Sequence, residues 1–159
     1  MIGSQAILAT YPATDLPSGV TLSVEADIAF FDDEHENKSD MVDGAVGEDS
    51  AFHQTFGYYG QGVSISTATL PVGWEDRLVR FDPEDSKPAT SVCLDPIDLI
   101  VSKLVAGREK DLSYAEYLLE SGHIKAEEIA QRAELLSGVG AIRRRVIGHI
   151  ERLTRKIKL

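Results

Sequence analysis

The sequence predicts an α+β fold, with an α/β-like core and a mixed sheet over residues 1–94 and a helical segment packed on it over residues 95–159. Two observations support this prediction. Residues 20–31 alternate between apolar and polar side chains, which is the period of a strand with one buried face. At Asp95 the pattern changes to helices separated by glycines.

In the first part we expect short helices and strands to alternate. A helix is predicted to begin at Ser4, a good N-cap residue, and a loop with two prolines follows over residues 12–19. The strand at 20–31 would place Glu25 and Asp27 opposite its apolar face. Beyond it we expect a short helix at 41–47, one or two strands within 52–70, and strands at 77–81 and 91–94.

The second part is predicted to be helical. Asp95 as N-cap and Pro96 at the first helical position indicate a helix that ends at Gly107. A capping box starting at Ser113 predicts the next helix, which ends at Gly122. Further helices are expected at 124–136 and 142–157.

Composition and charge narrow the class of protein. The single cysteine excludes an internal disulfide and fits a reducing compartment. Neither a signal peptide nor an apolar stretch of about 20 residues is visible, so we expect a cytoplasmic protein. The net charge is −10, but residues 141–159 contain seven basic residues and one acid, a local charge of +6. This end either binds an anionic partner or forms an amphipathic helix on its own acidic core.

Three groups of residues could carry chemistry. Glu25 and Asp27 share one face of the predicted strand, where two carboxylates can hold Mg²⁺ with waters and substrate phosphates; a solvated edge strand would show the same spacing. A Gly3-Ser4 turn before a helix presents free N–H groups to a phosphate, although such turns are common. The third group is a charged turn that could bind a triphosphate or form an interhelical salt bridge, and it consists of Lys103, Arg108, Lys110 and Asp111.

Three segments together resemble a known family. They are IGSQAIL at 2–8, SVEADI at 23–28, and CLDPIDL at 93–99 running on to SKLVAGREKD at 102–111. The chain is similar to a bacterial nucleotidyltransferase-like group of uncharacterised function, related to the AbiEii-type toxins of toxin–antitoxin and phage-defence systems. The resemblance extends to about residue 136, and the SKLVAGREKD string is its most specific part.

This resemblance implies a polymerase-β-type nucleotidyltransferase core. It implies that Gly3 and Ser4 hold the phosphates of an NTP, and that Glu25 and Asp27 bind Mg²⁺, or Mn²⁺ in its place. It further implies that Lys103 contacts the triphosphate, with Arg108 and Asp111 supporting the site. Asp82 is the geometric candidate for a third carboxylate ligand, and equally a turn residue before Pro83.

Two features depart from the family pattern. Glu25 stands where many active relatives carry Asp, which changes the metal geometry. Family members usually have a helix and a strand before the Gly-Ser turn, whereas only Met1 and Ile2 precede it here. An unfilled position in the sheet would expose a strand edge, so we expect a homodimer or a partner chain there.

Two functions follow. The first is a Mg²⁺-dependent nucleotidyltransferase that moves a nucleotide from an NTP to an RNA or protein acceptor, in a toxin–antitoxin or defence system, with the basic tail holding an RNA acceptor. The second is a non-catalytic partner or regulatory module with the same fold. Retention of the Gly3-Ser4 turn, the carboxylate pair and Lys103 favours the enzyme, while Glu25 and the short N-terminus favour the module.

Overall fold

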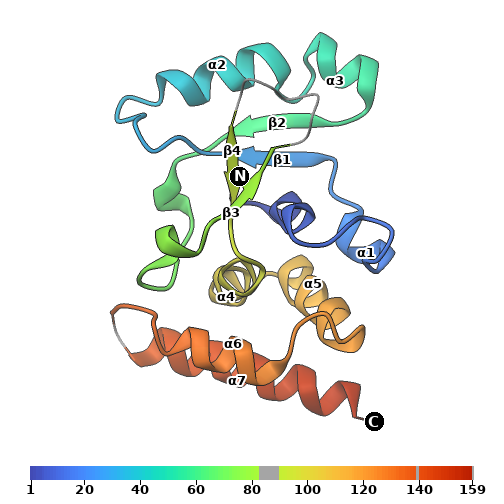
Figure 1. Cartoon of the computed structure of the whole chain (residues 1–159), viewed down its shortest axis with the longest axis vertical. Helices are drawn as coiled ribbons and strands as arrows, with labels where there is room; N and C mark the ends of the chain where they lie inside the picture. The colour runs from blue at the N-terminus through green and yellow to red at the C-terminus, as the bar shows by residue number, and fades with distance from the viewer. Residues whose placement is uncertain (83–89, 139, 159) are drawn as a thin grey trace.

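A computed structural model describes residues 1–82, 90–138 and 140–158 of the chain (Figure 1). Short strands lie at its centre, between two helices on one side and a larger helical group on the other. The elements are η1 (Ser4–Ala9), α1 (Ser18–Thr21), β1 (Glu25–Ile28), α2 (Asn37–Val46), α3 (Ala51–Phe56), β2 (Tyr59–Gly62), η2 (Ile65–Thr67), η3 (Trp74–Arg77), β3 (Val79–Phe81), β4 (Ser91–Cys93), α4 (Pro96–Ala106), α5 (Glu109–Glu120), α6 (Ala126–Ala133) and α7 (Gly140–Ile157). This mixture of helices and small sheets agrees with the predicted α+β class.

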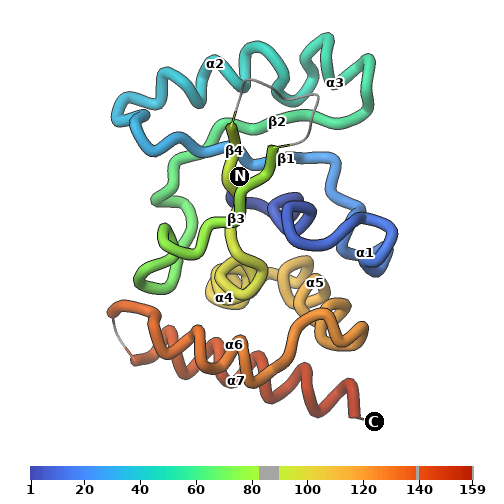
Figure 2. Tube along the Cα trace, in the orientation of Figure 1, coloured from blue at the N-terminus to red at the C-terminus, as the bar shows by residue number. Residues whose placement is uncertain are grey.

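The strands form two small sheets that the N-terminus connects. Strands β1 and β2 are parallel, with Glu25 opposite Tyr59, and β3 and β4 are antiparallel. The Ile2 N–H donates to the Asp27 carbonyl at 3.1 Å, and the Leu94 N–H donates to the Met1 carbonyl at 3.1 Å. The first two residues therefore lie between β1 and β4, near the N mark in Figure 2.

Helix α4 is the centre of the hydrophobic core and forms as predicted. The Asp95 carboxylate caps its start by accepting from the Ile97 and Asp98 N–H groups, and Gly107 ends it in the left-handed conformation at φ 65°. Leu99, Ile100 and Leu104 are fully buried in a cluster that includes residues from both predicted segments. None of the described helices is both long enough and apolar enough to cross a membrane.

The strand predicted at 20–31 was too long. Residues 18–21 form helix α1, and only Glu25–Ile28 are β-structure. Leu22, one of the apolar residues of the alternating run, is 75% exposed. The alternating pattern extends beyond β1 because the length of a strand depends on its hydrogen-bonded partner as well as on its side chains. The partner β2 has four residues, and four residues of β1 pair with them.

Other boundaries also differ from the prediction. The range 52–70, where one or two strands were expected, contains the strand β2. Its first residues belong to helix α3 instead, because the Ser50 side chain accepts from the His53 N–H and starts a helix. Helix α5 begins at Glu109, not at the capping box of Ser113, because the Arg108 carbonyl already accepts from two N–H groups of the first turn. The 3-10 helix η3 takes Arg77 out of the predicted strand at 77–81.

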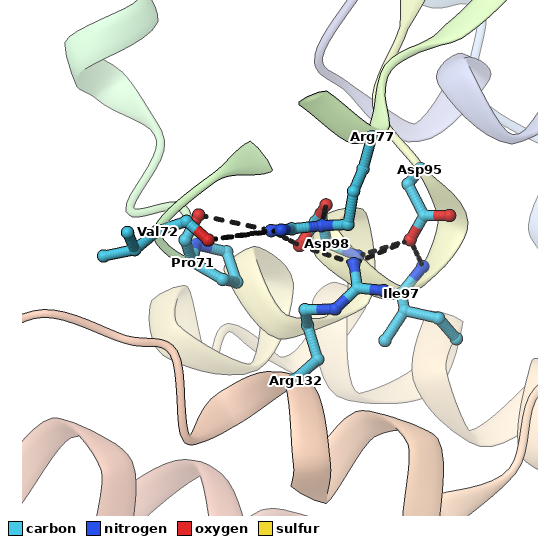
Figure 3. A network of polar contacts seen from close by, with 7 residues as sticks. All are labelled: Pro71, Val72, Arg77, Asp95, Ile97, Asp98 and Arg132. Atoms are coloured by element: carbon cyan, nitrogen blue, oxygen red, sulfur yellow. Dashed lines mark hydrogen bonds and ion pairs between the residues drawn. The ribbon is translucent and has the colours of Figure 1, made fainter. Parts of the chain in front are cut away.

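A buried ionic network holds the start of α4 in place (Figure 3). The Asp98 side chain is 0% exposed and accepts from Arg77 Nε at 2.8 Å and Arg77 Nη2 at 2.9 Å. Arg132 Nη1, from α6, lies 2.8 Å from Asp98 Oδ1 and 3.0 Å from Asp95 Oδ1. Because both arginines reach the same carboxylate, the network joins η3, α4 and α6 (Figure 3).

We predict that Asp98→Ala lowers the free energy of unfolding by about 3 kcal/mol, because it leaves two partly buried guanidinium groups without their shared carboxylate. Urea unfolding at pH 7 measures this. Lys38→Ala, which breaks the exposed pair with Asp32, is the control and should change stability by less than about 1 kcal/mol. Equal losses from both variants would contradict the role given to the network.

Candidate functional site

The site starts where the N-terminal turn meets β1. A Cβ atom on Gly3 would lie 1.5 Å from Asp27 Oδ2, so the Asp27 carboxylate occupies the space that any other side chain would need. The backbone of Gly3 is extended, so space and not conformational freedom requires glycine here. The hydrogen bond from Ile2 to the Asp27 carbonyl fixes the same contact. Gly3 and the Asp27 carboxylate are therefore in direct contact.

Ser4 is held by side chains of the helical segment. Lys103 Nζ donates to Ser4 Oγ at 2.9 Å, and the Tyr114 hydroxyl donates to the Ser4 carbonyl at 2.8 Å. Lys103 Nζ also lies 4.6 Å from the centre of the Tyr114 ring, a cation–π contact. Ser4 was expected to cap the first helix, but the N-cap position belongs to Gly3 and the Ser4 hydroxyl is instead an acceptor for Lys103.

Asp111 lies fully buried beneath this turn. It accepts from Arg108 Nε at 2.6 Å and from Lys103 Nζ at 3.2 Å. Burial alone would raise the pKa of Asp111, but the Arg108 hydrogen bond and the Lys103 charge hold that pKa below its usual value. Burial lowers the pKa of Lys103, and the Asp111 carboxylate opposes this shift. The turn between α4 and α5 is thus an ion triad, so the salt bridge that was one of the two alternatives for this turn is present.

The two carboxylates of β1 lack such partners. Glu25 and Asp27 form no ion pair with any residue that the structure describes. Burial raises the pKa of both groups, and the negative charge of Asp27 raises that of Glu25 further. The charges of Arg108 and Lys110 act in the opposite direction on both. The carboxylates therefore favour an added cation.

A pocket of about 200 Å³ collects four of the predicted site residues, namely Gly3, Asp27, Lys103 and Arg108. Its other walls carry apolar side chains and the hydroxyl-bearing residues Thr67, Thr69 and Ser102. Ser4 and Lys103 line an adjoining hollow with Lys110 and Tyr114. Glu25 lines a different hollow, next to Tyr58 and Phe81. The pocket thus contains Asp27 but not its partner on β1.

Sequence reasoning missed several residues of this site. The sequence indicates Lys110 only as part of a charged turn, yet its charge acts on both carboxylates of β1. The sequence places Tyr114 within a capping box, and nothing in the sequence indicates Thr67 or Thr69. Asp82, the candidate third ligand, pairs with Arg80. Within the described ranges, no three His, Cys, Asp or Glu side chains are placed to hold a metal ion together.

Comparison with known families matches residues 1–136 to one described as a nucleotidyltransferase of unknown function (DUF6036). The matched region contains every residue of the pocket and ends before α7. No curated protein and no solved structure matches the chain.

We predict that Gly3→Ala destabilises the protein by about 1–3 kcal/mol, because the added methyl group must displace the Asp27 carboxylate or the backbone. Urea unfolding measures the change. Gly44→Ala in α2 is the matched control, since a Cβ there meets nothing within 4 Å, and it should stabilise the helix by up to about 1 kcal/mol. A Gly3→Ala protein as stable as the wild type would disprove the close contact.

We predict that Asp27→Asn raises the melting temperature at pH 7. The pKa of Asp27 is raised in the folded protein, so ionisation costs folding stability above the unfolded pKa of 3.8, and this cost disappears as the pH falls below that value. Asparagine does not ionise, so the difference between the proteins should shrink between pH 7 and pH ~4. Thermal unfolding across this range tests it, and a less stable variant at pH 7 would show that the carboxylate stabilises the fold.

Proposed function

The chain belongs to this nucleotidyltransferase family, and from that premise we propose that it transfers a nucleotide from an NTP to an acceptor hydroxyl with Mg²⁺ bound at β1. One observation carries the proposal. In a single pocket, the unpaired Asp27 carboxylate lies against Gly3 and opposite the cations Lys103 and Arg108. A phosphate chain with a divalent ion needs both negative ligands for the ion and positive groups for the phosphates.

Arg108 and Lys110 are the groups that we assign to the triphosphate. Arg108 also donates to Asp111 through Nε, but its side chain is 63% exposed at the pocket, and Lys110 lies in the adjoining hollow. Lys103 was expected to contact the triphosphate, but its side chain is 12% exposed and its ammonium already binds Ser4 and Asp111. We therefore assign Lys103 to holding the Gly3-Ser4 turn in position, while its charge still acts on a phosphate bound beside it.

The donor set fits a magnesium ion. Glu25 and Asp27 alternate on one strand, have raised pKa values, and form no ion pair with the described part of the chain. Magnesium binds by one or two carboxylates and takes its remaining ligands from water and substrate phosphates, so Asp27, the member of the pair that lines the pocket, suffices as its carboxylate ligand. When bound there, Mg²⁺, or Mn²⁺ with similar ligand preference, would neutralise charge on the departing pyrophosphate.

The residues of the chain would act on the transfer as follows. The acceptor oxygen forms a bond to the α-phosphorus, and the bond from that phosphorus to the bridging oxygen breaks, releasing pyrophosphate. Arg108 and Lys110 would stabilise the negative charge on the leaving group. The acceptor proton would pass to solvent.

A second candidate is a non-catalytic module with this fold. The observation in its favour is that Glu25 lines a hollow separate from the Asp27 pocket, so the pair does not face one ligand site. In that case the pocket would bind a nucleotide without transferring it. A role in a toxin–antitoxin or defence system, with a polymerase-β-type core, would be compatible with either candidate.

We predict that each NTP tested by calorimetric titration binds only with Mg²⁺ present, and that Asp27→Asn abolishes this binding while the protein stays folded. Lys110→Gln should weaken binding of the triphosphate about tenfold and leave nucleoside binding unchanged, because the ammonium acts on phosphate. Arg80→Gln, at an exposed arginine of β3 outside the pocket, should leave both affinities unchanged. Binding of no NTP would reject the nucleotide site. Binding with no pyrophosphate release when acceptors are supplied would favour the non-catalytic module.

A further inference from the structure

Glu25 lines a hollow that the proposed nucleotide site does not use. The hollow has a volume of about 460 Å³, more than twice the volume of about 200 Å³ of the pocket that contains Asp27. It lies beside α3 where β1 and β2 begin, since Glu25 and Tyr59 are the first residues of these strands (Figure 1). Sites for small molecules have volumes of ~300–1,000 Å³, so this space is large enough for one. We call it the Glu25 hollow.

The walls of the Glu25 hollow combine aromatic rings with a carboxylate. Tyr58 and Tyr59 come from the start of β2, and Phe81 comes from the end of β3. Glu25 is opposite Tyr59 in the parallel ladder, so the two side chains leave the sheet on the same face. Tyr58 is 54% exposed, so solvent reaches the hollow at this ring.

Helix α3 holds both tyrosine rings from outside the hollow. The Phe52 ring meets the Tyr58 ring edge-on, with the ring centres 5.4 Å apart, and the His53 ring centre lies 4.8 Å from that of Tyr59. Because these contacts set the two tyrosine rings before a ligand arrives, less side-chain entropy is lost on binding.

The hollow contains an acidic side chain and no basic one. Glu25 forms no ion pair with any described residue, and no described lysine, arginine or histidine lines the hollow. The charges of Arg108 and Lys110 reach Glu25, but these two side chains line other hollows. A ligand that enters therefore meets a carboxylate without a bound partner.

The remaining polar groups of the lining are already hydrogen-bonded. The side chains of Gln5, Thr21 and Ser23 each donate to a backbone carbonyl. The Met1 ammonium donates to the Val92 carbonyl at 2.6 Å. The Glu25 carboxylate is therefore the charged acceptor that the hollow offers, and most of the surrounding surface is aromatic or aliphatic.

We propose that the Glu25 hollow binds a small organic ammonium ion whose nitrogen carries apolar carbon groups. Aromatic faces attract a cation within about 6 Å of the ring centre, and the carboxylate neutralises its charge. The carbon groups of the ligand gain by leaving water for the apolar walls. This ligand is independent of the nucleotide transfer proposed above, and it gives a role to the carboxylate that lies outside the Asp27 pocket.

Other cations fit the hollow less well. Magnesium keeps several waters and requires oxygen ligands, whereas this lining offers one carboxylate among apolar groups. A guanidinium group has five N–H donors in a fixed plane, and a single carboxylate accepts only two of them well. A quaternary ammonium has no N–H group to satisfy, so burial in an aromatic hollow leaves no donor unpaired.

The experiment is an NMR titration of the full chain with choline, followed through the backbone amide signals. The comparison ligand is 3,3-dimethyl-1-butanol, which has the shape of choline with a neutral carbon in place of the nitrogen. We expect choline to shift the signals of residues in the Glu25 hollow and to bind about tenfold more tightly than the neutral analogue. Equal affinities, or no binding of choline, would overturn the proposal.

Two variants test the carboxylate and the rings separately. Glu25→Gln should weaken choline binding about tenfold and leave binding of the neutral analogue unchanged, because only the charge is removed. Tyr58→Leu keeps an apolar side chain but removes a ring, and it should weaken choline binding about threefold. Circular dichroism checks that both variants are folded. An unchanged affinity for choline in both would overturn the site.

Matched controls lie outside the hollow. Glu127→Gln, at an exposed position of α6, and Phe31→Leu, at a side chain that is 63% exposed, should each change the affinity for choline less than twofold. Losses equal to those of the two hollow variants would contradict the location.

Two competitors test the identity of the ligand. Excess Mg²⁺ should leave choline binding unchanged, and displacement of choline would assign Glu25 to a metal instead. A lysine-containing peptide that binds more tightly than choline would overturn the assignment to a small molecule in favour of a protein partner.

Discussion

A carboxylate without access to water has to be neutralised, and the way this chain neutralises Asp111 determines the geometry around it. Lys103 comes from α4 and Arg108 from the turn that follows, so the two cations bring the end of α4 and the start of α5 together. Because Lys103 also reaches Ser4, the same interaction anchors the N-terminal turn, 99 residues away in sequence. The position of Gly3 against Asp27 depends on that anchor, as does the pocket between them.

The opposite end of α4 is fixed by similar means. Asp98 is enclosed by guanidinium groups from η3 and α6, and Asp95 caps the helix while sharing Arg132. Ionic anchors at both ends, with an apolar body between them, make α4 the element against which η1, α5, α6 and α7 pack. In a protein with such short strands, this helix and not the sheet fixes the site.

The sequence predicted best where the local signals were strongest. Asp95, Pro96 and Gly107 define α4 by side-chain capping and backbone conformation, which need no distant partner, and the helix follows them. Glu25–Ile28 could not be separated from the longer alternating run, because only the length of β2 limits it. Of the predicted site residues, Gly3, Asp27, Lys103 and Arg108 share one pocket. The engagement of Lys103 by Ser4 and Tyr114 depends on packing between distant segments, which a single sequence does not reveal.

The contact between Gly3 and Asp27 also has an evolutionary consequence. The space that residue 3 leaves empty is the space that the carboxylate of residue 27 fills, so neither position can change freely while the other stays the same. A larger side chain at position 3 can arise only where residue 27 is already shorter or its side chain points elsewhere. A protein with such a change has lost the carboxylate on which the site depends. Among relatives that retain the site, the two positions should be inherited together, as co-varying residues in contact are.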